Sequence, residues 1–235
     1  QNYEPEFYGP EDPLRLRARS TYGDQVNLNY ITISEWCQQW LWEQYGHVSG
    51  RARNGIDLSQ FESRRRTPGE KVRILIEGDS SAEHKNVDES FSIVSLLDPQ
   101  RYEIWYLAYH GEPKEWYRVD RFLSAIPYDR VQEVYSACDI LLKSSVLESF
   151  SYPPLEMMAT GGYVVAVQNA GNAEYLKDGE NCLIYPLGDV EAGAERIREI
   201  CRDSRLQERL YQNGLKTASD RTWEKAGREI LSLYQ

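Results

Sequence analysis

Two glutamates separated by seven residues, Glu148 and Glu156, are the best candidates for chemistry in this sequence. They cannot share one regular helix, because Pro153 and Pro154 stand between them and proline is tolerated only in the first helical turn. We therefore expect Glu148 in a loop and Glu156 in the first turn of a helix, holding different parts of one ligand. A carboxylate only accepts hydrogen bonds, so it suits a pair of sugar hydroxyls.

The helix that follows the loop offers a place for phosphate. It is expected to start near Pro153–Pro154 and to stop near Thr160, because Gly161-Gly162 follow. The N–H groups around residues 151–155 then have no intrahelical acceptor and lie at the positive end of the helix dipole. Phosphate in the middle and hydroxyls at both ends describe a nucleotide sugar.

The elements that position this stretch alternate between strands and helices. The apolar runs predict strands at 72–76, 102–109, 139–142, 163–167 and 181–185. Helical spacing predicts helices around 87–97 and at 128–137, 190–201, 205–219 and 222–234. This alternation indicates an α/β fold, a doubly wound parallel sheet covered on both faces. Ligands bind such sheets at the carboxyl ends of the strands, where Gly78 and Ser144 lie.

The N-terminal part has a different character. Residues 1–30 show little periodicity and give no prediction of regular structure. Short strands at 29–33 and 48–53 flank a helix at 35–45, which Ser34 caps and Gly46 ends. We expect residues 1–60 to be the remnant of a second, truncated α/β domain.

The predicted boundary follows that remnant. Asn54-Gly55 is a turn signal, and residues 61–70, with Arg64-Arg65-Arg66 and Pro68-Gly69, are predicted to be a solvated linker. Residues 71–235 then make one complete domain. Since the chain begins with Gln1 instead of methionine, we expect it to be a fragment of a longer protein.

The motif and its flanks resemble a known family. Glu148, seven residues and Glu156 look like the Glu-x7-Glu motif of retaining GT-B glycosyltransferases, the large family that includes sucrose synthase. The order of the flanking segments is similar too: Ala-Cys-Asp-Ile at 137–140, Ser144-Ser145, and the Gly-Gly-Tyr-Val-Val-Ala-Val strand at 161–167. The run at 151–157 is most similar to rhamnosyltransferases of bacterial polysaccharide assembly.

The resemblance implies a fold and an activity. The fold is the C-terminal, Rossmann-like half of a GT-B enzyme, which binds the nucleotide-sugar donor, with TDP or UDP as the expected nucleotide. The activity is transfer of the sugar with retention of the anomeric configuration. A carbohydrate or lipid-linked acceptor would bind to the N-terminal half. Because most of that half is missing here, the chain alone is expected to turn over slowly or not at all.

The resemblance also implies roles for individual residues. Glu148 would be the catalytic residue that meets the transferred sugar, and Glu156 would bind the ribose hydroxyls. Ile126 would hold the base through its main chain. The phosphates would receive N–H groups from Phe150, Ser151 and Tyr152.

A departure from the family pattern concerns the cation for the diphosphate. The family usually places an arginine after the glycine that corresponds to Gly78, but this chain has Asp79 there. The cation predicted to bind the diphosphate is therefore Lys85, a flexible point charge. The same departure keeps one alternative open, a degenerate module that binds a nucleotide sugar or a partner without catalysis. A GT-B relative with other chemistry, such as a sugar-nucleotide epimerase, is a second alternative.

Composition excludes several classes of protein. The net charge of −10 argues against nucleic acid and anionic membranes as partners, and no apolar run is long enough to span a membrane. The four cysteines form no Cys-x-x-Cys pair, which favours free thiols in the cytoplasm. The full-length parent could still contact the inner membrane face. No Asp-x-Asp occurs, so we expect no catalytic metal, and no cofactor is expected.

Overall fold

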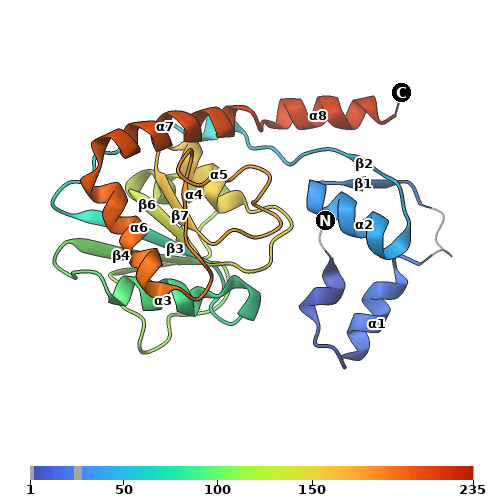
Figure 1. Ribbon diagram of the computed structural model, residues 1–235, viewed down its shortest axis with the longest axis horizontal. Helices are drawn as coiled ribbons and strands as arrows, with labels where there is room; N and C mark the ends of the chain where they lie inside the picture. The colour runs from blue at the N-terminus through green and yellow to red at the C-terminus, as the bar shows by residue number, and fades with distance from the viewer. Residues whose placement is uncertain (1–2, 24–27, 235) are drawn as a thin grey trace.

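The computed structural model describes residues 3–23 and 28–234, which form a large and a small lobe (Figure 1). Residues 1–2, 24–27 and 235, which belong to the two predicted units, lie outside the described residues. The large lobe is built on a six-stranded parallel sheet, and the small lobe on a two-stranded one.

The large sheet has the order β5-β4-β3-β6-β7-β8, and each neighbouring pair is parallel. Its strands are β3 (Val72–Glu77), β4 (Tyr102–Ala108), β5 (Arg121–Ser124), β6 (Ile140–Lys143), β7 (Tyr163–Ala166) and β8 (Leu183–Ile184). Because the chain moves outward from β3 to β5 and then returns to start again at β6, the sheet is doubly wound. The predicted α/β fold with a parallel sheet is confirmed.

Helices cover both faces of the large sheet. On one face lie α3 (Val87–Ser95), α6 (Val190–Arg202) and α7 (Ser204–Ser219). On the other lie α4 (Tyr128–Ala137) and α5 (Tyr152–Ala159). The last helix, α8 (Trp223–Ser232), runs from the large lobe toward the small one (Figure 1). Strand β5 was not predicted.

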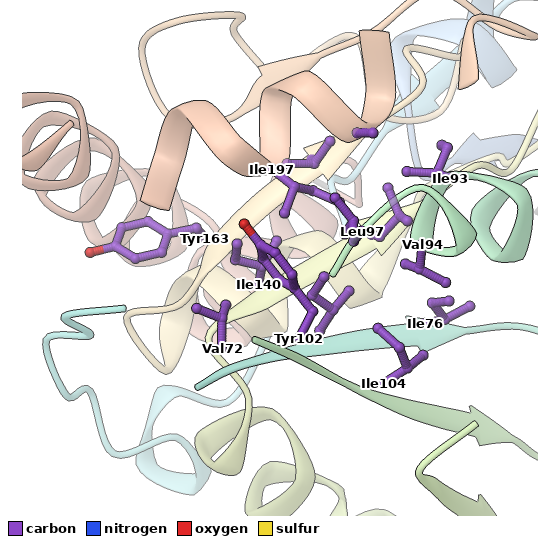
Figure 2. Packing of buried hydrophobic residues seen from close by; sticks show 14 of the residues in the cluster. Val72, Ile76, Ile93, Val94, Leu97, Tyr102, Ile104, Ile140, Tyr163 and Ile197 are labelled. Atoms are coloured by element: carbon purple, nitrogen blue, oxygen red, sulfur yellow. The ribbon is translucent and has the colours of Figure 1, made fainter. Parts of the chain in front are cut away.

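Alternation along the strands fills both faces of the core. Ile74 and Ile76 of β3 pack against the α3 and α6 side, while Leu75 packs against the α4 and α5 side. Figure 2 shows the first cluster, in which Ile76 and Ile104 of the sheet lie beneath Val94 of α3. Both faces of the strands are thus buried, as expected for a parallel sheet inside helices.

The small lobe contains η1 (Glu4–Phe7), α1 (Pro13–Ser20), β1 (Tyr30–Thr32), α2 (Glu35–Tyr45) and β2 (Ser49–Arg51). Ser34 caps α2 and Gly46 ends it with a φ of 69°, as predicted. Helix α1 was not predicted, because residues 1–30 show little periodicity. That helix begins where the Asp12 carboxylate accepts the Leu14 N–H and Pro13 takes the first position.

The segment between the lobes, which includes η2 (Leu58–Gln60), is partly buried. The Arg66 guanidinium donates to backbone carbonyls of the linker itself (Arg64), of the end of α4 (Tyr135 to Cys138) and of the end of α5 (Thr160). Its side chain is buried, so the prediction of a solvated linker is wrong at this residue. Five carbonyls at helix ends and in the linker accept from this one side chain, which explains why an arginine, with its five N–H donors, is used there.

Contacts of several kinds join the lobes. The backbone N–H of Glu35 at the start of α2 donates to the Glu174 carboxylate at 2.9 Å. The Arg53 side chain pairs with Glu229 of α8, and the Phe7 ring lies 5.3 Å from that of His84. Across the described residues, no helix combines the length and the apolar character that crossing a membrane requires.

Candidate functional site

The candidate site lies where the order of the large sheet reverses, between β3 and β6. These strands are parallel neighbours, so Glu77-Gly78 and Lys143-Ser144 leave the sheet at the same edge. Gly78 adopts a φ of 147°, and a Cβ there would lie 3.0 Å from Val87. Only glycine fits this backbone. The reversal point of a doubly wound sheet is where such folds bind ligands.

Four charged side chains alternate in sign at this edge. The Lys143 ammonium lies 2.5 Å from the Glu77 carboxylate and 3.7 Å from that of Glu148. The Lys85 ammonium donates to the same Glu148 oxygen at 2.8 Å. The Lys143 side chain is only 2% exposed, against 13% for Glu148 and 27% for Lys85. The formal charges of this network cancel.

The lysines decide the ionisation of Glu148. Burial raises the pKa of its carboxyl, but the attraction of Lys143 and then of Lys85 outweighs burial, so the net pKa lies below its usual value. Burial likewise lowers the pKa of the Lys143 ammonium, while Glu77 and Glu148 raise it by more. The site therefore carries Glu148 as a carboxylate and Lys143 as a cation at neutral pH.

Glu156 lies in a different environment. It is the fifth residue of α5, one turn later than predicted, because the helix already begins at Tyr152. Its side chain is buried at 6% exposure and lines a pocket of about 240 Å³. The pocket also contains Glu77, Trp223 and four tyrosines: Tyr109, Tyr128, Tyr135 and Tyr152.

Among the described residues, no cation offsets the effect of burial on Glu156. Burial raises the pKa of its carboxyl to about 7, a hydrogen bond from Tyr135 opposes that rise, and the charge of Glu77 adds to it. The carboxyl is therefore close to half protonated at neutral pH. A group in this state, in a pocket with aromatic walls, can either donate or accept a hydrogen bond.

The loop before α5 leaves backbone donors free. Within the described residues, the N–H groups of Phe150, Ser151 and Tyr152 donate no hydrogen bond to the protein. The Phe150 ring is buried against Tyr152 and Tyr175, which fixes the path of the backbone. The Tyr175 hydroxyl donates to the Ser151 carbonyl, so the loop is held from behind. These donors lie at the positive end of a helix, on a backbone that its neighbours hold in place.

A second loop supports the first. The Asn169 side chain donates to the Ser145 carbonyl at 2.8 Å and accepts from the N–H groups of Gly171 and Asn172 at 3.1 Å. A Cβ at Gly171 would lie 2.1 Å from the Glu148 carbonyl oxygen, so only glycine allows the loops to approach this closely. The backbone of Glu148 is thus fixed by contact with the loop after β7.

Asp79, which replaces the expected arginine, faces away from the charged network. Its carboxylate accepts from the N–H and the hydroxyl of Ser81 at 2.8 and 2.6 Å, which forms a tight turn and lowers its pKa. Its role in the structure is to shape the loop that carries Lys85.

The structure brings some predicted residues together and leaves others apart. Gly78, Lys85 and Glu148 meet at the charged network, while Tyr152 and Glu156 share the pocket. The Ser144 hydroxyl is buried behind the site, where it contacts Ser90 and accepts from Tyr185. Its side chain is therefore turned away from the crevice, and its donor-binding role stays a prediction.

Ile126 lies at the edge of the site. Its side chain lines a separate pocket of about 220 Å³ with Trp105 and Arg121, not the pocket of Glu156. Its backbone N–H donates to no acceptor among the described residues, and Ala125 before it has a positive φ of 48°. A free main-chain donor fits the contact with a base that was predicted for Ile126.

Sequence reasoning missed Glu77, Lys143 and three of the four tyrosines of the pocket, Tyr109, Tyr128 and Tyr135. Glu77 and Lys143 did leave a signal, since each is a charged residue at the end of an apolar strand, at the edge where ligands bind. Their pairing could not be seen before the register of β3 and β6 was known. The four tyrosines come from three segments: Tyr109 follows β4, Tyr128 and Tyr135 lie on α4, and Tyr152 begins α5.

The comparison with protein families matches residues 118–217 to the model described as "Glycosyl transferases group 1". A search of curated proteins finds the O-antigen biosynthesis protein RfbC of Myxococcus xanthus, 28% identical over 95% of this chain and 18% of RfbC. It also finds a D-inositol 3-phosphate glycosyltransferase of Corynebacterium urealyticum, 27% identical over 50% of this chain and 28% of that protein. The chain thus spans less than a third of the length of these relatives.

Solved structures share the fold. Sucrose-phosphate synthase of Thermosynechococcus elongatus matches 100% of this chain and 65% of its own, with a TM-score of 0.81 and 18% identity. HepE of Anabaena, solved in complex with UDP-glucose, matches 100% of this chain and 70% of its own, with a TM-score of 0.81 and 17% identity.

The fold is therefore that of GT-B glycosyltransferase structures, and the large lobe is their C-terminal, Rossmann-like half. The match to the family model is confined to residues 118–217, within the large lobe, and the structural neighbours show the fold.

Proposed function

We propose that this chain carries the donor-binding half of a glycosyltransferase that takes a sugar from a nucleotide diphosphate and transfers it with retention. The observation that carries the proposal is the pair of motif glutamates near the reversal point of the sheet: Glu156 is buried, the Glu148 side chain is 13% exposed, and free backbone N–H groups lie between them in the chain. This arrangement suits a nucleotide sugar, in which a diphosphate stands between the hydroxyls of the ribose and those of the sugar.

Each part of the site has an assigned role in this proposal. The ribose would occupy the pocket beside Glu156, with the base near the free N–H of Ile126. The diphosphate would receive the N–H groups of Phe150, Ser151 and Tyr152 together with Lys85. The sugar would lie against Glu148, whose lowered pKa keeps it negative at neutral pH.

The charge distribution fits the chemistry. In the transition state the bond from the anomeric carbon to the diphosphate breaks, so positive charge grows on the sugar and negative charge on the leaving group. A fixed carboxylate beside the sugar and N–H donors with a cation beside the phosphates would stabilise both charges. A new bond to an acceptor hydroxyl on the same face of the sugar gives retention.

The relatives point to polysaccharide assembly. RfbC is named for O-antigen biosynthesis, and HepE was solved with UDP-glucose. We extend these names to a UDP- or TDP-sugar donor and to a carbohydrate or lipid-linked acceptor. A rhamnose donor remains the prediction from residues 151–157. Residues 3–23 and 28–60 would be the part of the acceptor domain that this chain contains, with 71–234 as the donor domain.

Calorimetric titration with UDP, TDP, GDP and ADP tests the proposal. One of them should bind, and Glu156→Ala should weaken it by about 10-fold or more, as expected for the loss of a hydrogen bond to a carboxylate. Glu191→Ala, an exposed glutamate in α6, is the matched control and should bind as the wild type does. Absence of binding for all four nucleotides, or equal binding by Glu156→Ala, would count against the donor site.

Retention needs a separate measurement on the full-length parent. The anomeric configuration of the product, read by NMR against that of the donor, should be unchanged. An inverted product would contradict retention without removing the donor site. A product released without an acceptor, as a free epimerised sugar nucleotide, would favour the epimerase alternative.

A further inference from the structure

Two lysines contact Glu148, but they are held very differently. Lys143 is on a strand of the sheet, 2% exposed, and donates both to the Glu77 carbonyl at 3.0 Å and to the Glu77 carboxylate at 2.5 Å. Lys85 is at the end of η3 (Glu83–Lys85), more exposed, and has the Glu148 carboxylate as its ion-pair partner among the described residues. Lys143 is fixed, whereas Lys85 can turn away by rotating its side chain.

We propose that Lys143 is a positioning residue, which holds Glu148 in place as a carboxylate while Lys85 leaves Glu148 to bind the phosphates of a nucleotide diphosphate. The exchange of Lys85 rests on the proposed function, because that function supplies the ligand. The role of Lys143 toward Glu148 does not depend on a ligand.

The need for such a residue follows from burial. If Lys85 were the sole counter-ion of Glu148, its departure would leave an unpaired charge at a buried position. An unpaired buried carboxylate takes up a proton or costs several kcal/mol. Lys143 lies 3.7 Å from Glu148 and cannot leave, because Glu77 holds it from the other side. Glu148 therefore keeps its charge and its place through the exchange.

Other groups near Glu148 do not supply this charge. His84, on the same turn as Lys85, has its pKa lowered by burial and by Lys85, so it is neutral at pH 7. Tyr175, behind the loop, has its pKa raised by burial and by Glu148, so it is neutral too. Glu77 is negative. Among the described residues, the two lysines are the cations that lower the pKa of Glu148.

A titration without ligand tests the role of Lys143. Lys85→Met imitates the departure of Lys85, and carboxyl ¹³C NMR follows the ionisation of Glu148, with Glu148→Gln to assign its signal. In Lys85→Met the carboxyl should still titrate at or below the ordinary range of a glutamate. In Lys85→Met/Lys143→Met its pKa should rise by about 1–3 units or more, because no opposite charge remains beside a buried group.

Two further variants keep this test decisive. If the double variant does not fold, Glu77→Gln is added, which removes the buried charge that Lys143 would otherwise leave unpaired; the pKa of Glu148 should rise as before. Lys85→Met/Lys114→Met removes an exposed lysine from a surface pair instead, and should leave Glu148 unchanged. A raised pKa already in Lys85→Met alone would overturn the proposal, because Lys85 would then be the dominant counter-ion.

Calorimetry in buffers of different ionisation enthalpy tests the exchange itself. On binding UDP, Glu77→Gln/Lys143→Met should take up more protons than the wild type at neutral pH, up to one more per site. Uridine lacks phosphates, so Lys85 should stay paired with Glu148 when uridine binds. The variant and the wild type should then take up the same number of protons. Equal proton uptake with UDP overturns the exchange. If the wild type binds none of UDP, TDP, GDP and ADP, both the exchange of Lys85 and the proposed function are overturned. If the NMR titration shows a raised pKa of Glu148 in Lys85→Met alone, only the role of Lys143 is overturned.

Discussion

Glu148 and Glu156 are the same residue type, eight positions apart, and both side chains are mostly shielded from solvent, yet their surroundings shift their acidity in opposite directions. Glu148 lies against Lys143 and Lys85, and its pKa falls. Glu156 lies in a pocket lined by tyrosines, where burial and then the negative charge of Glu77 raise its pKa to about 7. Burial acts on both; the presence of a cation decides the sign.

The opposite pKa shifts give the two ends of the proposed donor site different charges: negative at Glu148, where the sugar would lie, and close to neutral at Glu156, where the ribose would lie. A carboxylate that stays ionised suits the sugar end, where positive charge develops in the proposed reaction. A carboxyl that is close to neutral can donate as well as accept, which suits a ribose diol. Environments that push two carboxyl groups apart in pKa are typical of sites in which the two groups have different tasks. The predictions below test each side of this contrast.

The largest effect is expected on the Glu148 side, from Lys143→Met. This change leaves two buried carboxylates, Glu77 and Glu148, without their shared cation, and removing one partner of a buried pair costs about 3–5 kcal/mol. The free energy of unfolding from urea denaturation measures the loss. Lys114→Met is the matched control, since its pair with Asp88 is about half exposed and should contribute less than about 1 kcal/mol.

A loss no larger than that of Lys114→Met would break the comparison. It would mean that Glu77 and Glu148 become hydrated or protonated at little cost when Lys143 is lost. The surroundings of Glu148 would then not differ from those of Glu156 by the presence of a cation that matters for stability. The pH dependence gives a second check. Because the folded pKa of Glu148 is depressed, its contribution to stability is present above the ordinary glutamate range and is lost as pH falls through the depressed pKa.

The Glu156 side should show the opposite pH dependence. Its folded pKa of about 7 lies above the ordinary value of 4.5, so the folded state binds more protons and the free energy of unfolding falls as pH rises between these values. At about 1.4 kcal/mol per pKa unit, the loss is on the order of 3 kcal/mol. Glu156→Gln cannot ionise, and should be free of this loss when urea denaturation is repeated from pH 4 to pH 8.

Glu133→Gln serves as the control, because that glutamate is exposed on α4 and pairs with Arg130 at the surface. It should follow the wild type across the same range. If Glu156→Gln instead loses as much stability as the wild type between pH 4.5 and 7, then another group titrates there, and Glu156 is not the protonated partner in the contrast.

The fold was largely predictable, because each strand of the core is a continuous apolar run and each helix that covers it has an apolar face. Strand β5 was missed for the opposite reason: its residues are mostly exposed at the sheet edge, and pairing with β4 holds it there. Helix α1 was missed because Leu14, Arg15, Leu16 and Arg17 alternate with a period of two, while Asp12 and Pro13 carried the true signal.

The site was predictable only in part. The motif located Glu148, Glu156 and the free N–H groups because they lie within one short stretch. The environment of each glutamate comes from other strands. Lys143 of β6 pairs with Glu148, while Glu77 of β3 pairs with Lys143 and raises the pKa of Glu156. Whether a buried carboxyl becomes a stronger or a weaker acid depends on those neighbours, and the sequence does not state which residues are neighbours across a sheet.

The smallest effect is expected from a change in the loop that supports the backbone of Glu148. If Glu148 is fixed by the loop after β7, Gly171→Ala should disturb it, because the new Cβ would lie 2.1 Å from the Glu148 carbonyl oxygen. Forcing the loops apart should cost about 1–3 kcal/mol in urea denaturation and shift the ¹³C signal of the Glu148 carboxyl. Gly227→Ala is the matched control: it is in α8 with nothing within 4 Å, so alanine should stabilise the helix by about 0.5–1 kcal/mol. If Gly171→Ala behaves like Gly227→Ala and leaves the ¹³C signal of Glu148 unchanged, the loop after β7 does not fix Glu148. The two lysines alone would then hold this carboxylate, and Glu148 would differ from Glu156 only in the charges around it.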